Sequence, residues 1–160
     1  MRRCSFHGRI ALLVISFFAS LIYADVQRIE LLNGDIYEGE LKDGVRTGQG
    51  RLERPGGAWY EGEFLNGRIH GDGLYTWADG RIYQGTFQND KQHGPGTLRW
   101  PNGSTYAGDF LENRRTGKGR FVSADEDVYE GDFLNDQMHG NGSYVWSDGR
   151  RYEGTFRDGV

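Results

Sequence analysis

The sequence of 160 residues is poor in cysteine and proline, and it lacks the long periodic apolar runs of amphipathic helices. Its one cysteine, Cys4, lies near the N-terminus, so the rest of the chain cannot form an internal disulfide and must be stabilised by packing. Only three prolines and no low-complexity tract argue against disorder. By contrast, 26 glycines and 14% aromatic residues are typical of an all-β fold with regular turns.

The sequence also lacks the short motifs of common catalytic sites. It contains no nucleophile elbow, no phosphate-binding loop and no arrangement of cysteine with histidine. The carboxylate pairs Glu38/Glu40 and Glu61/Glu63 each share one face of a strand, but no insertion interrupts the chain to house a reaction. We therefore expect no catalytic residues, no cofactor and no enzymatic activity, and a hydrolase is only a third alternative.

The charge balance argues against another class of function. The net charge is −4 at pH 7, whereas proteins that bind nucleic acid or anionic lipid by bulk charge are basic. We therefore expect no nucleic acid partner, and membrane lipid is a partner that the net charge does not favour.

The one basic cluster consists of Arg114, Arg115, Lys118 and Arg120. It is expected to be a solvated loop, with a weak anionic contact as the alternative.

A motif with a period of 23 residues organises the chain. Tyr-x-Gly-x-Leu/Phe recurs without insertion or deletion, and a Gly-x-Gly pair follows each of the first five copies. The Tyr and Gly residues of the motif are Tyr37 and Gly39, Tyr60 and Gly62, Tyr83 and Gly85, Tyr106 and Gly108, Tyr129 and Gly131, and Tyr152 and Gly154. Six regular copies indicate a repeat protein in which each unit contacts only its neighbours.

Turn dipeptides that end in Gly separate two strands in every copy except the fifth. Asn33-Gly34 and Asp79-Gly80, for example, accept the positive φ that hairpin loops require. A three-residue loop at 78–80 pairs Tyr75 with Tyr83 and keeps the aromatic residues of this hairpin on one face. A two-residue loop would send them to both faces, so we expect the first register.

Two features depart from the regular hairpins. In the fifth copy Glu126 stands where other copies have Gly, so we expect that turn to be strained or rearranged. The segments between hairpins, such as Gln88–Gly94 and Leu134–Gly140, are polar and contain glycine. We expect them to be loops that line one edge of the molecule.

These patterns predict a single elongated, twisted antiparallel sheet of stacked β-hairpins over residues 25–160. The hairpins are expected at approximately 26–48, 49–71, 72–94, 95–117, 118–140 and 141–160. On the aromatic face the motif tyrosines would form one ladder of side chains. A second ladder would consist of Leu41, Phe64, Phe87, Phe110, Phe133 and Phe156. Glycines beside the rings leave room for a neighbouring ring. The opposite face mixes acidic with apolar residues, so a partner or a second copy could cover part of it.

Residues 1–24 lie outside the repeat. Arg2 and Arg3 precede an apolar run of 14 residues, and the small residue Ala24 follows it. This order predicts a short helical signal segment that is cleaved as a signal peptide. A permanent anchor needs about 20 apolar residues, and an uncleaved N-terminal membrane anchor is the alternative. Cleavage would leave residues 25–160 without cysteine and with a net charge of −7.

The whole pattern, Tyr-x-Gly-x-Phe followed by His-Gly-x-Gly and Asp/Asn-Gly, resembles the MORN repeat (membrane occupation and recognition nexus). The resemblance covers residues 26–158, and His70, His93 and His139 stand at the family's His position. It implies an elongated sheet of stacked hairpins, sometimes as a dimer, with a scaffolding or protein-binding role. It also implies phospholipid binding, as proposed for some members, and no catalysis unless an enzyme domain is attached.

Two sets of side chains are possible binding surfaces. The three repeated histidines lie on strands ~10 Å apart, too far for the ligands of one metal ion, so we expect no metal site and a hydrogen-bonding role at the hairpin junctions. The second set is Trp77, Trp100 and Trp146. These rings could stack on glycans, but we expect them to be the ends of the packed face.

Two functional hypotheses follow. The first is a non-catalytic exported scaffold, periplasmic or secreted, that presents its sheet face and loop edge to a protein partner. The second is an attachment module that binds membrane phospholipid or cell-wall glycan through its loops and Trp-bearing turns. Because open sheet edges invite pairing, we also expect a homodimer or a capped complex.

Overall fold

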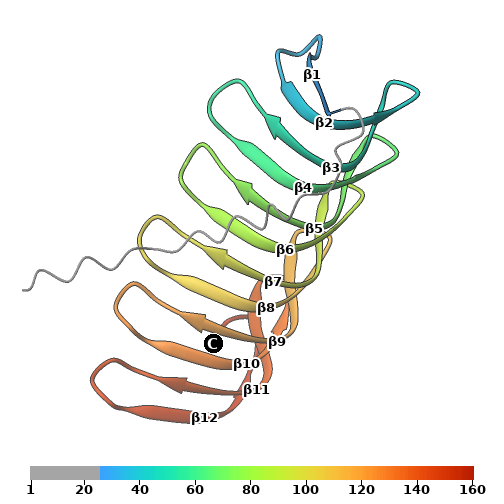
Figure 1. Cartoon of the computed structure of the whole chain (residues 1–160). Coiled ribbons are helices and arrows are strands. Elements are labelled where there is room, and N and C mark those ends of the chain that lie inside the picture. The colour runs from blue at the N-terminus through green and yellow to red at the C-terminus, as the bar shows by residue number, and fades with distance from the viewer. Residues whose placement is uncertain (1–25) are drawn as a thin grey trace, which may run out of the picture.

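The computed structural model describes residues 26–160, which form one open antiparallel sheet of twelve strands (Figure 1). The strand order follows the chain order, so each strand pairs only with its sequence neighbours. The strands are β1 (Val26–Glu30), β2 (Ile36–Lys42), β3 (Val45–Glu53), β4 (Trp59–Leu65), β5 (Arg68–Thr76), β6 (Ile82–Gln88), β7 (Lys91–Arg99), β8 (Thr105–Leu111), β9 (Arg114–Val122), β10 (Val128–Leu134), β11 (Gln137–Val145) and β12 (Arg151–Phe156). The expected all-β sheet is confirmed. The expected signal peptide, residues 1–24, lies outside the described residues.

The register of the hairpin loops agrees with the alternation of side chains. Tyr75 lies opposite Tyr83 across β5 and β6. The backbone N–H of Trp77 donates to the carbonyl of Arg81 at 2.9 Å, and the N–H of Gly80 donates to the carbonyl of Trp77 at 2.9 Å. Gly80 has a φ of 88°, a left-handed conformation that glycine adopts without steric cost. The expected three-residue loop is therefore confirmed.

The fifth hairpin loop keeps the same geometry without its glycine. The N–H of Ser123 donates to the carbonyl of Asp127 at 2.8 Å, and the N–H of Glu126 donates to Ser123 at 3.1 Å. Glu126 takes a φ of 68° at the position that Gly80 occupies in its own loop. Of the two expected outcomes, rearrangement is not observed, and Glu126 adopts the left-handed conformation in which a side chain is strained.

The segments expected to be loops between hairpins are strands instead, which corrects that expectation. β6 continues to Gln88 and β7 begins at Lys91, so only Asn89 and Asp90 connect them. Both residues have positive φ, 51° and 69°, as a two-residue hairpin turn requires. The strands are therefore longer than expected, and each repeat contains two tight turns, one at each side of the sheet in Figure 1.

Each repeat also contains an irregularity that bends the sheet. In β2 and β3, Gly39 lies opposite Gly50, but the next residue, Glu40, lies opposite Thr47, so the pairing skips two residues. Gly48, one of the skipped residues, has a φ of 57°. Such bulges bend a strand and increase its twist. Figure 1 shows the strands curving between the two rows of turns.

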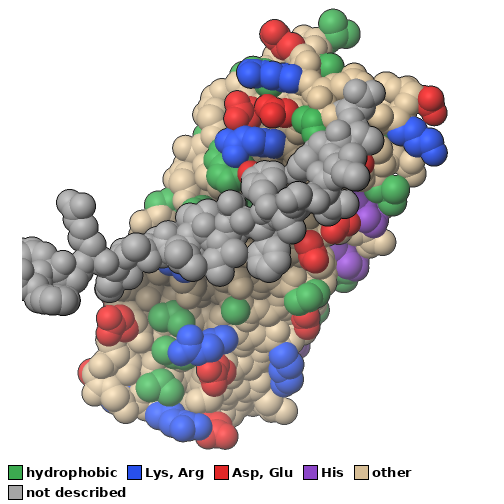
Figure 2. Space-filling model, viewed as in Figure 1, with side chains coloured by type: hydrophobic (Ala, Val, Ile, Leu, Met, Phe, Trp, Pro, Cys, Tyr) green, Lys and Arg blue, Asp and Glu red, His purple; other side chains and the backbone are tan. Residues whose placement is uncertain are grey.

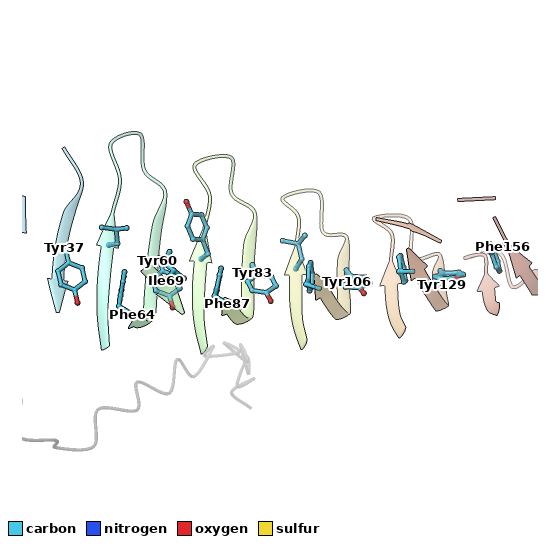
Figure 3. Packing of buried hydrophobic residues seen from close by; sticks show 14 residues of the cluster. Tyr37, Tyr60, Phe64, Ile69, Tyr83, Phe87, Tyr106, Tyr129 and Phe156 are labelled. Carbon is cyan, nitrogen blue, oxygen red and sulfur yellow. The ribbon is translucent and has the colours of Figure 1, made fainter. Parts of the chain in front are cut away.

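The core lies inside this bend and contains the two expected ladders, together with Leu52, Ile69, Tyr75 and Leu98 (Figure 3). Phe64 packs edge-on between two tyrosines, with its ring centroid 5.1 Å from that of Tyr37 and 5.2 Å from that of Tyr60. This edge-to-face geometry is favourable for aromatic pairs and is repeated along the whole sheet. A Cβ on Gly39 or Gly50 would collide with the Tyr37 ring, so bare backbone makes room for the ring as expected.

Candidate interaction surface

The motif tyrosines fasten the bend from inside. The hydroxyl of Tyr37 donates to the carbonyl of Glu40, three residues ahead, at 2.9 Å. The other five tyrosines make the same bond, to the carbonyls of Glu63, Thr86, Asp109, Asp132 and Thr155. Burial raises the pKa of Tyr37 and Tyr106 to about 12, so these phenols keep their protons even above pH 10. The motif tyrosines thus hold the repeat together, and all of them except Tyr152 are fully buried.

On the outer side of the sheet, an acidic side chain stabilises the bend of each of two repeats by a hydrogen bond. Glu40 lies against Gly48, and its carboxylate accepts the N–H of Gln49 at 3.2 Å. Asp132 does the same in the last full repeat, where it accepts the N–H of Asn141 at 3.1 Å. An ion pair with Lys118 at 2.7 Å is the main reason that the pKa of Asp132 lies below its usual value. These acids have structural roles.

The predicted histidines contribute to the hydrogen bonds at the bend through their backbone carbonyls. The carbonyls of His70 and His139 accept second, longer hydrogen bonds from Tyr60 and Tyr129 at 3.3 Å. The carbonyl of His93 accepts a bond from the Thr86 hydroxyl. The expected role at the hairpin junction is thus found for the peptide group, whereas no imidazole hydrogen bond occurs within residues 26–160. Along the same residues, no group of three or more His, Cys, Asp or Glu side chains is arranged to hold a metal ion.

Trp77 and Trp146 lie at the ends of the packed face, each just beyond a strand and beside the tyrosine two residues before it. The ring of Trp77 lies 4.6 Å from that of Tyr75. The Arg81 guanidinium lies 4.9 Å from the Trp77 ring and is held there by Asp79 at 2.8 Å. A bond from the Arg81 backbone N–H is the main cause of the lowered pKa of Asp79. The same arrangement recurs around Trp146. Each of these two rings therefore stacks against an arginine of its own turn.

Trp100 lacks such an arginine in its turn and is approached by Arg115 instead. The Arg115 guanidinium lies 5.7 Å from the Trp100 ring and 5.4 Å from the Phe133 ring, and it pairs with Asp136 at 3.2 Å. Only 20% of its side chain is exposed. The basic cluster expected to be a solvated loop is therefore part of strand β9, with Arg115 packed on the aromatic core.

The face opposite the aromatic ladders carries ion pairs at both ends of the sheet. Arg51 pairs with Glu61 at 3.3 Å near one end, and Arg120 pairs with Glu130 at 2.7 Å near the other. Figure 2 shows acidic and basic side chains side by side in the upper and lower parts of this face. This outer face also holds a set of hydrophobic side chains, among them Ile82, which is 38% exposed.

Between the two charged ends, one row of the outer face carries no charge. Its members lie opposite one another across β5 to β8. They are Leu74, Gln84, Thr97 and Ala107. Together with Ile82 we call these residues the central outer patch. The structure thus offers one uncharged row framed by ion pairs, next to Ile82, whose cross-strand neighbour is Arg99. The predicted Trp and His residues do not come together in one site.

No helix in the part of the chain that the structure describes is long and apolar enough to cross a membrane. No curated protein matches the sequence. Among solved structures, the SAS-4 (dCPAP) TCP domain of Drosophila melanogaster, in complex with a proline-rich motif of Ana2 (dSTIL), is similar with 14% identity over 97% of this chain and 86% of that chain, at a TM-score of 0.49. The TCP10c domain of Drosophila melanogaster Sas-4 is similar with 13% identity over 82% of this chain and 100% of that chain, at a TM-score of 0.34. With TM-scores this low, no property of those proteins carries over to this chain.

The family model of the MORN repeat matches five consecutive stretches, residues 37–59, 60–80, 83–105, 106–128 and 129–150. Each matched stretch begins with a motif tyrosine, and together they cover more than half of the chain. The match does not include the sixth copy, at Tyr152. The chain belongs to the MORN repeat family.

Proposed function

We propose that this chain is a non-catalytic, exported scaffold that binds a protein partner through its central outer patch. The observation that carries the proposal is the uncharged row from Leu74 to Ala107, which lies between the ion pairs Arg51–Glu61 and Arg120–Glu130 of the same row. Protein interfaces are depleted of charge at their centre and have a polar rim. The partner would present an uncharged, partly apolar surface to the patch and opposite charges to its rim.

The inner face is less suited to a partner. Except for Tyr152, its motif tyrosines are buried against phenylalanines, and two of its three tryptophans are stacked against arginines. Glycan attachment needs an open aromatic ring face, so the stacking of Arg81 and Arg150 supports the scaffold over the glycan alternative. The acidic net charge of −4 likewise supports the scaffold over phospholipid attachment.

The test is affinity capture of partners from the envelope of the source cell, with the protein and two variants compared. Ile82→Lys places a charge in the central outer patch and should abolish retention of the partner. Glu38→Gln removes a charge from the same face, outside the patch and the two ion pairs of its rim, and should leave retention unchanged. Equal retention by the protein and Ile82→Lys would exclude the patch.

Pelleting assays address the two attachment alternatives. The protein should remain in solution with anionic liposomes and with cell-wall material at moderate salt. Co-sedimentation with either would replace the scaffold proposal by attachment. A broad hydrolase screen should find no turnover, and turnover abolished by one Asp or Glu substitution would establish an enzyme.

Export rests on the sequence of residues 1–24. Mass measurement of the protein from its native source should show a chain that begins at Asp25, with the signal peptide removed. A mass that includes residues 1–24, in the membrane fraction, would indicate the anchored alternative. A chain of full mass in the cytoplasm would exclude export.

A further inference from the structure

The two edge strands of the described sheet, β1 and β12, match each other in register. The motif tyrosine of each even strand lies opposite a fixed position of the next odd strand, as Tyr37 of β2 lies opposite Leu52 of β3. The residue of β1 at that position, 23 residues before Leu52, is Ile29. A strand added beyond β12 in the same register would therefore place Ile29 of a second copy opposite Tyr152.

This register brings together opposite charges on the outer face. Glu153 would lie opposite Arg28 of the second copy, and Arg151 would lie opposite its Glu30. All four side chains are exposed in one copy, where Arg151 and Glu153 pair with each other at 2.8 Å. Within the chain, Arg28 already lies opposite Glu38 in the same row, so the joint would continue an existing alternation of charge. Opposite charges directly across strands are stabilising.

The aromatic ladder is also unfinished at the two edges. Tyr152 is 44% exposed, although the other five motif tyrosines are fully buried. Within the chain, Phe156 packs on Tyr152, whereas Tyr129 contacts two phenylalanines. At the other edge, Leu41 occupies the phenylalanine row of the first repeat and is partly buried. In a second copy placed in register, Leu41 would cover Tyr152 as Phe156 covers Tyr129.

We propose that copies of this chain associate head to tail, with β12 of one copy pairing antiparallel with β1 of the next. The direction of the strands fits, because β12 would pair with β1 as each even strand pairs with the following odd strand. A contact between two different edges is heterologous, and because it would continue the same open sheet from copy to copy, it produces open chains of increasing length. This inference goes beyond the proposed scaffold function, because it uses the edges of the sheet and leaves the central outer patch free.

One residue of β1 makes the joint weaker than the contacts within the chain. Gln27 stands 23 residues before Gly50, a glycine that the Tyr37 ring covers. A side chain at this position meets the ring of Tyr152 from the preceding copy. Gln27→Gly should therefore tighten the association, a gain that a misfolded variant cannot imitate.

Sedimentation velocity of the full-length protein over a wide concentration range tests the proposal. The protein should form species that grow with concentration. Glu153→Arg and Arg28→Glu should each replace an attractive pair by a repulsive one and raise the dissociation constant about tenfold. An equimolar mixture of these two variants should recover the association of the unchanged protein, because each joint in an alternating chain is again attractive.

The control is Glu130→Arg, which changes an exposed acid of the same row away from either edge. Its association should equal that of the unchanged protein. A monomer at all concentrations, a dimer that does not grow, no recovery in the mixture, or no tightening by Gln27→Gly would overturn the proposal. Since the partner capture above depends on Ile82, it can succeed or fail independently of these outcomes.

Discussion

Asp90 connects its turn to the preceding repeat by two hydrogen bonds to Ile69. The N–H of Asp90 donates to the carbonyl of Ile69 at 2.9 Å, and Oδ1 of Asp90 accepts the N–H of Ile69 at 2.9 Å. Asn113 and Asp136 make the same pair of bonds, to Gln92 and Arg115. These side chains accept hydrogen bonds from backbone N–H groups of the preceding repeat, so each turn stabilises the contact between neighbouring repeats.

Replacement of Asp90 by alanine should lower the free energy of unfolding by about 2 kcal/mol, because it removes one hydrogen bond and places alanine in a left-handed conformation. Asp90→Asn is the matched control, since Asn113 makes the same bonds in the next repeat. Urea unfolding measures both. Equal losses for the two variants would show that the side-chain bond contributes nothing.

Gln92 is a buried polar residue in an otherwise packed position. It is 5% exposed, and its Nε2 has no hydrogen-bond partner among the described residues. Ile69 and Met138 occupy the same position in other repeats. Gln92→Met should therefore raise the free energy of unfolding by about 1 kcal/mol, because it removes an unpaired amide from the core. Gln84→Met, on the exposed outer face, should leave stability nearly unchanged, and a loss of stability in Gln92→Met would contradict this account.

Much of the sheet could be predicted because the residues beside the hairpin loops alternate between apolar and polar. The pairing of Tyr75 with Tyr83 and the two ladders follow from that alternation together with the period of 23. The second set of turns could not be predicted in this way. Lys91 and its neighbours are polar on both sides of the turn, so no alternation distinguishes strand from loop.

The sequence around Arg115 does not clearly indicate that its side chain packs on the aromatic core. Its row across the repeats contains two arginines, a glutamine, an isoleucine and a methionine, so it does not read as a core position. A comparison with Ile69 and Met138, 46 residues before and 23 residues after it, would have indicated burial. For the histidines the sequence predicts a hydrogen-bonding role at the hairpin junction, but a sequence pattern does not distinguish a role of the carbonyl, which the structure shows, from a role of the side chain.

Glu126 keeps a glycine-type conformation at φ 68° and should be a point of strain. Glu126→Gly should raise the free energy of unfolding by about 1 kcal/mol, since a side chain in the left-handed region costs about that much. The reverse substitution in another loop, Gly80→Glu, should lower stability by a similar amount. Thermal unfolding of both variants measures the two shifts, and shifts in the same direction would contradict the assignment.

The hydroxyl of each motif tyrosine should raise the free energy of unfolding through its hydrogen bond to the carbonyl three residues ahead. Tyr83→Phe removes the bond to the carbonyl of Thr86 at 3.0 Å and should cost about 1 kcal/mol. Tyr152→Phe is the matched control, because its bond to Thr155 at 3.2 Å lies at an exposed ring and should contribute less. An equal cost at both positions would show that burial of the hydroxyl is unimportant.

The same buried phenols should make the protein unfold in alkali. Burial raises the pKa of Tyr37 and Tyr106 from 10.0 to about 12, and burial also raises the pKa of Tyr60 and Tyr83. Below pH 10 both the folded and the unfolded chain keep these protons, and the stability is fully present.

Between pH 10 and about 12 the unfolded chain loses the phenolic protons first, so the free energy of unfolding falls as pH rises. Urea midpoints measured across this range should decrease steadily. Tyr106→Phe removes one of the ionising groups, so its midpoints should decrease less steeply than those of the unchanged protein. Identical slopes for the two proteins would mean that ionisation of groups other than this phenol causes the alkaline unfolding.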